Sequence, residues 1–158
     1  FLRFADPPKA NARKAIDDLS ALGIQLKVIT GDNQQVAVQV AKAVGLRVDH
    51  ILTGSKISQL NDDALSLLAN KTDIFAEIDP QQKERIIRAL QKRGHAVGYM
   101  GDGINDAPAL QAADVGISVD QAVDVARPSA DIVLLKLDLG VLKPGVVSGR
   151  RTLCNPLK

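Results

Sequence analysis

The stretch MGDGINDAPAL, residues 100–110, decides the fold of this 158-residue sequence. It places Asp102, Asn105 and Asp106 on a turn with two glycines, directly after the apolar run HAVGYM of residues 95–100. Glycine permits positive φ angles and lets a ligand approach the backbone closely. In parallel sheets, ligands bind beyond the carboxyl ends of the strands. We therefore expect residues 95–100 to form such a strand and the turn to be part of a site.

Apolar runs and helical segments alternate along the rest of the chain. The predicted strands are residues 1–5, 25–29, 50–54, 73–77, 95–100, 115–119 and 131–136. The predicted helices begin at Asp6-Pro7-Pro8, after Asp32-Asn33, at residue 58, at Asp79-Pro80, at Asp106-Ala107-Pro108 and at residue 121. Continuously apolar strands with helices between them imply a mostly parallel, Rossmann-like sheet with helices on both faces. We predict one α/β domain over residues 1–158.

Helix periodicity and glycine stops support these boundaries. Val36, Val40 and Val44 repeat on one face of the second helix. Gly23 and Gly45 stand where the first two helices should end, because glycine accepts the left-handed conformation after a last turn.

The composition is that of a globular protein, with 46% hydrophobic and 24% charged residues. A net charge of +2 and only four aromatic residues, one Tyr and three Phe, give no basis for a nucleic-acid partner. The single cysteine, Cys154, fits a reducing compartment. No apolar run approaches the roughly 18 residues of a membrane span, so we expect a soluble chain without a transmembrane segment.

The glycine-rich turn has the chemistry of a magnesium site. Mg²⁺ prefers oxygen ligands and usually keeps water and substrate phosphate in its shell, and Asp102 is the predicted metal ligand. Asp106 is either a second, water-mediated metal ligand or the residue that orients the loop. Asn105 can donate to a phosphoryl oxygen. The competing interpretation is that Asn105 and Asp106 only make a turn and a helix cap.

Two further segments could bind an anion. Thr30-Gly31-Asp32 offers a hydroxyl and successive backbone N–H groups at a helix N-terminus, although an ordinary strand-to-helix turn explains it equally well. Lys83 lies in the first turn of a predicted helix, where the helix dipole disfavours a cation. A phosphoryl group would compensate its charge; alternatively, Lys83 is a solvated side chain. A carboxylate, an amide cradle and a lysine are the parts that phosphoryl transfer requires.

Four motifs occur in the order and spacing of one protein family. They are Asp6-Pro7-Pro8-Lys9, Thr30-Gly31-Asp32, Asp79-Pro80 with Lys83, and GDGIND of residues 101–106 followed by APAL. On these motifs the chain resembles the P-type ATPases, ion pumps of the haloacid-dehalogenase-like superfamily, over nearly its whole length. The stretch GISVDQAVDVARPSADIVLL, residues 116–135, is more similar to the magnesium-transporting subclass than to heavy-metal or calcium pumps.

The resemblance implies a role for each motif. The family's pumps form an aspartyl-phosphate from ATP, which splits the reaction into two steps. In that reaction Asp102 would bind the catalytic Mg²⁺, with Asp106 as a second metal or catalytic group. The remaining implied assignments are phosphoryl binding by Thr30 and Gly31, charge neutralisation by Lys83, nucleotide proximity for Asp32, and completion of the site by Gly103 and Asn105.

The sequence departs from the family in one decisive place. It contains neither the Asp-Lys-Thr-Gly-Thr segment that bears the nucleophile nor any Asp-x-Asp pair. The resemblance thus implies the C-terminal part of a phosphorylation domain, whose missing strand would lie between the Thr30 strand and the Asp102 strand. We expect such a chain to be unable to autophosphorylate. Glu77 also stands where many relatives carry an arginine that helps to bind nucleotide.

The implied parent protein is an ATP-driven pump for a cation, Mg²⁺ by subclass, at the cytoplasmic face of the cell membrane. Its partners would be ATP, Mg²⁺, the transported cation and the remaining pump domains. Two alternatives are a soluble phosphatase using Asp6 as nucleophile and a non-catalytic domain that binds Mg²⁺ and phosphate. A dinucleotide-binding protein is disfavoured because Asp106 stands where that fingerprint needs a small residue.

Overall fold

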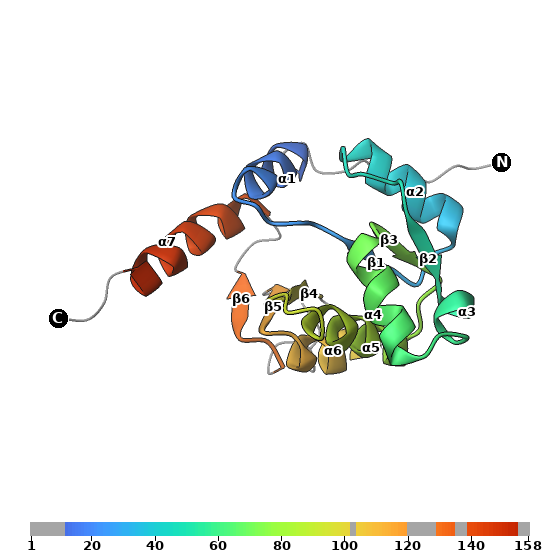
Figure 1. Ribbon diagram of the computed structural model, residues 1–158. Coiled ribbons are helices and arrows are strands. Elements are labelled where there is room, and N and C mark those ends of the chain that lie inside the picture. The colour runs from blue at the N-terminus through green and yellow to red at the C-terminus, as the bar shows by residue number, and fades with distance from the viewer. Residues whose placement is uncertain (1–11, 102–103, 120–128, 135–138, 155–158) are drawn as a thin grey trace.

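A computed structural model describes residues 12–101, 104–119, 129–134 and 139–154 (Figure 1). The helices are α1 (Ala12–Ala21), α2 (Gln34–Ala43), α3 (Gly54–Ile57), α4 (Asp62–Lys71), α5 (Pro80–Gln91), α6 (Ala107–Ala112) and α7 (Leu142–Cys154). The strands are β1 (Val28–Ile29), β2 (Ile51–Thr53), β3 (Ile74–Ala76), β4 (Gly98–Met100), β5 (Val115–Val119) and β6 (Ile132–Leu134). Two 3-10 turns, η1 (Ile104–Asp106) and η2 (Leu139–Val141), complete the described elements. Every described strand lies within or overlaps a predicted one.

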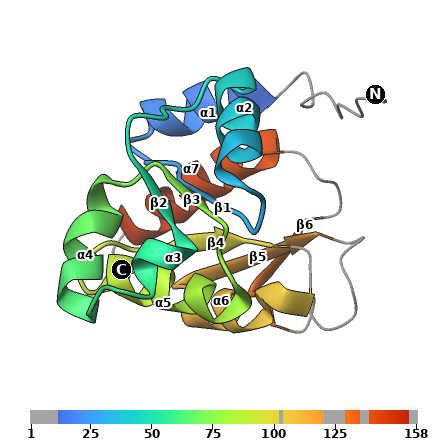
Figure 2. The ribbon, with the colours of Figure 1, turned by 90° about the vertical axis from the view of Figure 1, so that its right-hand side faces the viewer.

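The described strands form two three-stranded parallel sheets rather than one continuous sheet. The first sheet has the order β1-β3-β2, and the second has the order β4-β5-β6. All of their pairings are parallel, which confirms the predicted α/β class. Strands β1 and β4 are edge strands of their sheets, and Figures 1 and 2 show them as the two edges that lie nearest each other. The sheet is therefore divided between the Thr30 strand and the strand that precedes Asp102.

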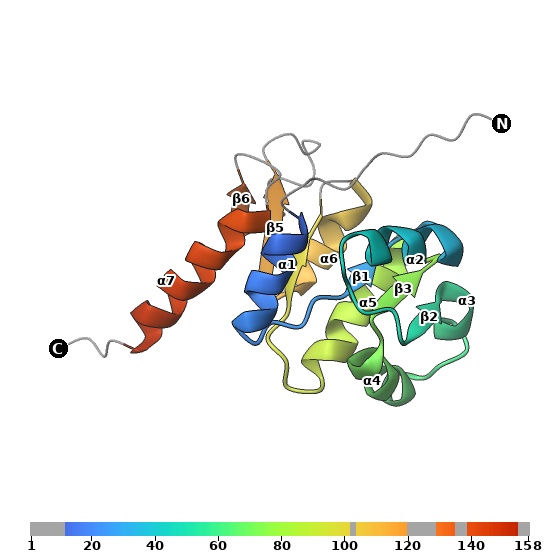
Figure 3. The ribbon, with the colours of Figure 1, turned by 90° about the horizontal axis from the view of Figure 1, so that it is seen from above.

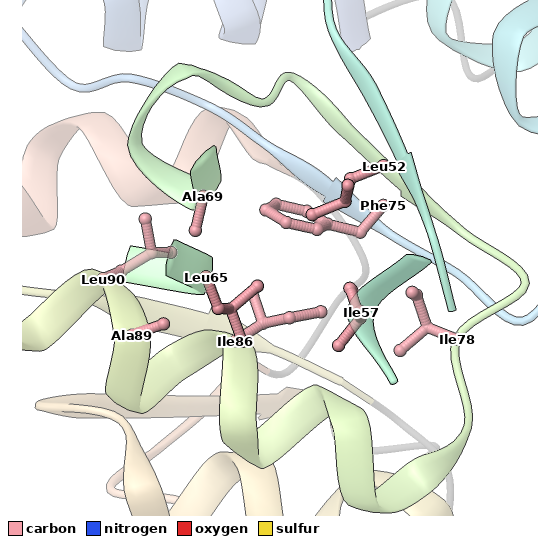
Figure 4. Packing of buried hydrophobic residues seen from close by; sticks show 9 residues of the cluster. All are labelled: Leu52, Ile57, Leu65, Ala69, Phe75, Ile78, Ile86, Ala89 and Leu90. Carbon is pink, nitrogen blue, oxygen red and sulfur yellow. The ribbon is translucent and has the colours of Figure 1, made fainter. Parts of the chain in front are cut away.

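Helix α5 joins the two sheets. Its residues Ile86, Ala89 and Leu90 belong to a core cluster with Phe75 of β3, which Figure 4 shows together with side chains from α3 and α4. The next residue after Ile86, Ile87, belongs instead to a cluster under the second sheet, with residues of β4 and α6. A helix with buried side chains on so wide a stripe can pack against two layers at once.

The other face of the first sheet is covered by α2 (Figures 1 and 2). Ala37 and Ala41 of α2 are buried against β3, whereas Val36 and Val40 remain 42% and 54% exposed. The valine stripe is thus not the face that packs on the sheet. Alanine has no side chain beyond Cβ, so its stripe lets the helix backbone approach the strand more closely than a valine stripe would.

Capping residues set most of the helix boundaries. Gly23 and Gly45 have φ angles of 77° and 81°, as expected for residues that stop a helix. The predicted helix of residues 58–70 is α4 in the structure, and it begins four residues later than expected because Asn61 caps it by accepting a hydrogen bond from the backbone N–H of Ala64. The short helix α3, which precedes residue 58, was not predicted. The predicted strand of residues 1–5, the predicted start of the first helix at Asp6-Pro7-Pro8 and the predicted helix at residue 121 lie outside the described residues. The described part of the first helix is α1.

Two polar contacts fasten α7 to α1 (Figure 3). Lys143 Nζ donates to Asp18 Oδ1 at 2.8 Å, and Arg150 Nη1 donates to the carbonyl oxygen of Leu22 at 2.8 Å. Pro144 is the third residue of α7, a position in the first turn where the missing N–H has no intrahelical partner in any case.

Two glycine-to-alanine substitutions should have opposite effects on stability. A Cβ at Gly116 would lie 2.6 Å from the carbonyl oxygen of Leu110, whereas a Cβ at Gly145 in α7 would meet nothing within 4 Å. We expect Gly116→Ala to lower the free energy of unfolding by about 1–3 kcal/mol through overpacking. Gly145→Ala should raise it by about 0.5–1 kcal/mol, since glycine is a poor helix former. Urea denaturation measures both, and equal effects would contradict the packing of α6 on β5.

Candidate functional site

Asp106 lies at the carboxyl end of β4, at the start of α6. The chain leaves β4 through Gly101, whose N–H donates to the carbonyl oxygen of Ile117 at 3.1 Å. A Cβ at Gly101 would lie 2.7 Å from Asp106 Cγ. The position therefore requires glycine, because the aspartate side chain occupies the space of any larger residue. The side chain of Asp106 is only 10% exposed.

Lys83 is the cation that faces this carboxylate. Helix α5 begins with a capping box, in which Asp79 and Gln82 each accept from the other's backbone N–H. This cap fixes the first turn of the helix, from which Lys83 Nζ donates to Asp106 Oδ1 at 2.7 Å. The Lys83 side chain is 15% exposed, so it is not the solvated side chain that the sequence allowed. In this structure the anion that compensates Lys83 is Asp106.

Tyr99 is a functional candidate that the sequence analysis missed. Its hydroxyl donates to the same oxygen, Asp106 Oδ1, at 2.6 Å. The sequence could have indicated Tyr99 through the alternation of side chains along β4. Tyr99 and Gly101 are two residues apart and therefore face the same side of the sheet. Lys83 and Tyr99 thus hold one carboxylate oxygen from two different elements, a helix and a strand.

The Thr30 loop folds on its own side chains. Thr30 Oγ1 donates to Asp32 Oδ2 at 3.0 Å and accepts from the backbone N–H of Asp32 at 3.1 Å. Asn33 caps α2 by accepting from the N–H of Val36 at 3.0 Å. The ordinary strand-to-helix turn that the sequence analysis weighed is therefore present, and Asn33 is its cap.

Glu77 places a carboxylate at the same helix end. It is the described non-glycine residue with a positive φ angle, 59°, a backbone conformation that costs energy for any residue with a side chain. Its Oε1 accepts from the N–H of Gln34, the first residue of α2, at 3.4 Å. An amide donor at the N-terminus of α2 therefore faces a carboxylate. The N–H of Asp32, one of the donors that we expected to face a phosphoryl group, bonds to Thr30 Oγ1.

Backbone hydrogen bonds link the Thr30 loop to the start of α5. The N–H of Ile78 donates to the carbonyl oxygen of Thr30 at 3.0 Å, and the N–H of Glu77 donates to that of Asp32 at 2.9 Å. Ile78 directly precedes the Asp79 cap of the helix that carries Lys83. The structure thus brings Lys83 into contact with Asp106 and connects Thr30, Gly31 and Asp32 to that pair through one loop.

The remaining predicted residues are placed only in part. Asn105 lies in η1 beside Asp106 and is exposed. Asp102, Gly103 and Asp6 lie outside the described residues. Within the described ranges, no group of three or more His, Cys, Asp or Glu side chains is placed to hold a metal ion. The prediction of an Mg²⁺ site consequently rests on Asp102 and its resemblance to the family motif.

Two shifted pKa values belong to groups away from this site. The backbone N–H of Val97 donates to Asp114 at 2.8 Å and, with Gln91, lowers the pKa of that carboxyl. This bond lies at the amino ends of β4 and β5, opposite to Asp106. Burial lowers the pKa of the Lys27 ammonium, which donates to the carbonyl oxygens of Asn70 and Thr72 and so ties β1 to the end of α4.

Comparison with known proteins agrees with the motifs. A profile described as haloacid dehalogenase-like hydrolase matches residues 1–114. The chain belongs to the haloacid dehalogenase-like hydrolase family. It is 53% identical to the Magnesium-transporting ATPase, P-type 1 of Salmonella typhimurium and 52% identical to that of Escherichia coli K12, in both cases over all of this chain and 18% of the relative. The predicted resemblance to magnesium-transporting P-type ATPases is thereby confirmed.

Solved structures give the same result for the fold. The crystal structure of a zinc-transporting PIB-type ATPase in the E2.Pi state superposes with a TM-score of 0.74 at 30% identity, over 94% of this chain and 20% of that chain. The chain therefore spans about a fifth of the length of the relatives it matches. No helix in the described part of the chain has the length and hydropathy to cross a membrane.

Two lysine–aspartate pairs of equal length should contribute differently to stability, because one is buried and the other is exposed. Lys83–Asp106 and Lys92–Asp63 both measure 2.7 Å, but the Lys92 and Asp63 side chains are 54% and 82% exposed. We expect Lys83→Met to lower the free energy of unfolding by about 3–5 kcal/mol, because it leaves a buried carboxylate without its cation. Lys92→Met should change it little, since solvent screens exposed pairs. Urea denaturation of both variants at pH 7 measures the difference, and similar losses would contradict it.

Proposed function

We propose that this chain is the C-terminal part of the phosphorylation domain of a P-type ATPase that transports Mg²⁺ and works through an aspartyl-phosphate. In this proposal the chain supplies the groups that bind Mg²⁺ and the phosphoryl group, and another segment supplies the nucleophilic aspartate. The observation that supports it most directly is the buried Lys83–Asp106 pair at the carboxyl end of β4. The chain's 53% identity to a magnesium-transporting ATPase supports the choice of ion.

The Lys83–Asp106 pair suits phosphoryl transfer because it keeps the Lys83 ammonium in place before a phosphoryl group binds. Phosphoryl transfer requires positioned positive charge near the transferred group more than it requires covalent chemistry. Lys83 has three N–H donors, and its bond to Asp106 uses one of them. Asp106 can therefore hold the ammonium while its remaining donors bind phosphoryl oxygens. Mg²⁺, which Asp102 would hold, would neutralise further phosphoryl charge when bound.

The two facing sheet edges are the proposed place of the nucleophile segment. Val28 and Thr30 of the first sheet direct their N–H groups to β3, so the backbone of Ile29 is directed to the open side. The N–H of Gly101 bonds to β5, so Gly98 and Met100 are directed away from β5. Both Ile29 and Val97 pack against the core clusters of α5. One parallel strand between β1 and β4 would join the two sheets into one.

This proposal predicts complementation by a separate polypeptide. The partner would be the segment of the Escherichia coli relative that contains Asp-Lys-Thr-Gly-Thr and the nucleotide-binding insertion. After mixing with this chain and incubation with labelled ATP and Mg²⁺, we expect an acid-stable, hydroxylamine-sensitive label on the partner. Neither polypeptide alone should be labelled to the same extent, because the phosphoryl-binding groups and the nucleophile would be on different chains.

Variants of this chain supply the controls for complementation. Lys83→Met should abolish the gain in label, whereas Lys92→Met, at the exposed pair, should leave it unchanged. A label on this chain alone would refute the proposed absence of the nucleophile and would favour a phosphatase that uses Asp6. No gain in label from a correctly associated pair would refute the pump assignment.

A separate prediction concerns the metal. Mg²⁺ should shift amide NMR signals of residues 101–106, and Asp102→Ala should abolish these shifts because it removes the proposed ligand. Asp114→Ala should preserve them, since Asp114 bonds to Val97 at the opposite end of the same strands. Loss of the shifts in both variants, or in neither, would contradict the assignment of Asp102.

A further inference from the structure

Ser118 of β5 has a buried hydroxyl group for which the described part of the protein offers no hydrogen-bond partner. The residue is 0% exposed, and its Oγ is the buried side-chain polar atom without a hydrogen-bond partner in the described part of the protein. An unpaired hydroxyl in a protein interior is unfavourable, because it loses its bonds to water and gains none in return. Alanine would fill the same position in the strand at no such cost.

The strand register places Ser118 next to the site. Tyr99 pairs with Gly116 and Met100 pairs with Ile117, and the bond from the Gly101 N–H to Ile117 continues this register. Gly101 is therefore the neighbour of Ser118 across the two strands. Because side chains alternate along each strand, Ser118 faces the same side of the sheet as Tyr99, whose hydroxyl bonds to Asp106.

The Asp106 carboxylate lies against Gly101, the residue directly after β4 that neighbours Ser118. Its Oδ1 accepts from Lys83 and Tyr99, while its Oδ2 would lie 2.9 Å from a Cβ at Gly101. Adjacent strands are about 4.8 Å apart. The Ser118 hydroxyl thus belongs to the strand next to the one against which Oδ2 lies, and because Oγ has no partner in this structure, a bond between them requires a side-chain rotation or one bridging water molecule.

The proposed function supplies a use for this hydroxyl, and the inference rests on it. When Lys83 also binds a phosphoryl group, its ammonium is shared between that anion and Asp106, so its bond to the Asp106 carboxylate weakens. A buried carboxylate must then be held by other donors, or it destabilises the site. We propose that Ser118 is a positioning residue, whose hydroxyl donates to the Asp106 carboxylate while Lys83 is engaged with the phosphoryl group. No covalent bond forms or breaks in this step, and the hydroxyl gains a hydrogen-bond acceptor that it lacks in this structure.

A double-mutant cycle on the 158-residue chain tests this proposal without nucleotide. Lys83→Met removes the ammonium bond to Asp106, as the extreme case of its weakening, and Ser118→Ala removes the hydroxyl. In the unsubstituted 158-residue chain we expect Ser118→Ala to leave the Tm unchanged or to raise it, since the hydroxyl has no partner there. In the Lys83→Met background we expect Ser118→Ala to lower the Tm by about 2–4 °C, because the hydroxyl is then a donor to Asp106.

Ser66→Ala is the matched control. Ser66 is also buried, but its hydroxyl donates to the carbonyl oxygen of Asp63 within α4, so its effect on the Tm should be the same in both backgrounds. Equal effects of Ser118→Ala in the two backgrounds would overturn the proposal. If Lys83→Met does not fold, the chain without that substitution decides. A fall of 2 °C or more in its Tm on Ser118→Ala shows that the hydroxyl already has a partner, and this result would also overturn the proposal.

Labelling separates this inference from the proposed function. In the complemented pair, Ser118→Ala should slow formation of the phosphate label about tenfold while the label reaches the same final amount, because the site is less well held but all reacting groups remain. An unchanged rate would overturn the role of Ser118. Coupling in the double-mutant cycle with no label from any pair would refute the pump assignment instead.

Discussion

The structure depends on the packing of α5 between two sheets. Adjacent residues of this helix, Ile86 and Ile87, are buried in two different core clusters, so the helix fixes the first sheet relative to the second. The same helix begins at the Asp79 cap and presents Lys83 from its first turn. The apolar stripe therefore does two things: it joins the halves of the fold, and it sets the position of the cation that meets Asp106.

Much of this arrangement could be predicted because it depends on local chemistry. The caps at Asp79 and Asn33, the glycine stops and the apolar runs act over a few residues, and the structure confirms each of them. The choice of the buried face of α2, in contrast, depends on contacts across the fold. Periodicity alone does not decide between the Val36 and Ala37 stripes of α2, since they lie one residue apart and only the approach of β3 selects the alanines.

In the candidate site, too, local sequence predicted individual residues but not the contacts between them. The motif predicted that Asp106 would matter, and the helix dipole predicted that Lys83 would need an anion, but neither pattern paired the two residues. They are 23 residues apart, and their bond requires both the crossover from α5 to β4 and the open space at Gly101. Tyr99 and Ser118 escaped prediction because their surroundings, a strand register and a neighbouring helix, are not visible in the local sequence.

Tyr99 is the only tyrosine of the sequence, which has no tryptophan. Its phenol bonds directly to the central carboxylate of the site, so the ultraviolet absorption and emission of the whole protein come almost entirely from one group at that position. The protein thus has a built-in optical reporter of the surroundings of Asp106. Any change in the charge around Asp106 can be followed by ordinary fluorimetry, without an attached dye and without interference from a second chromophore of this kind.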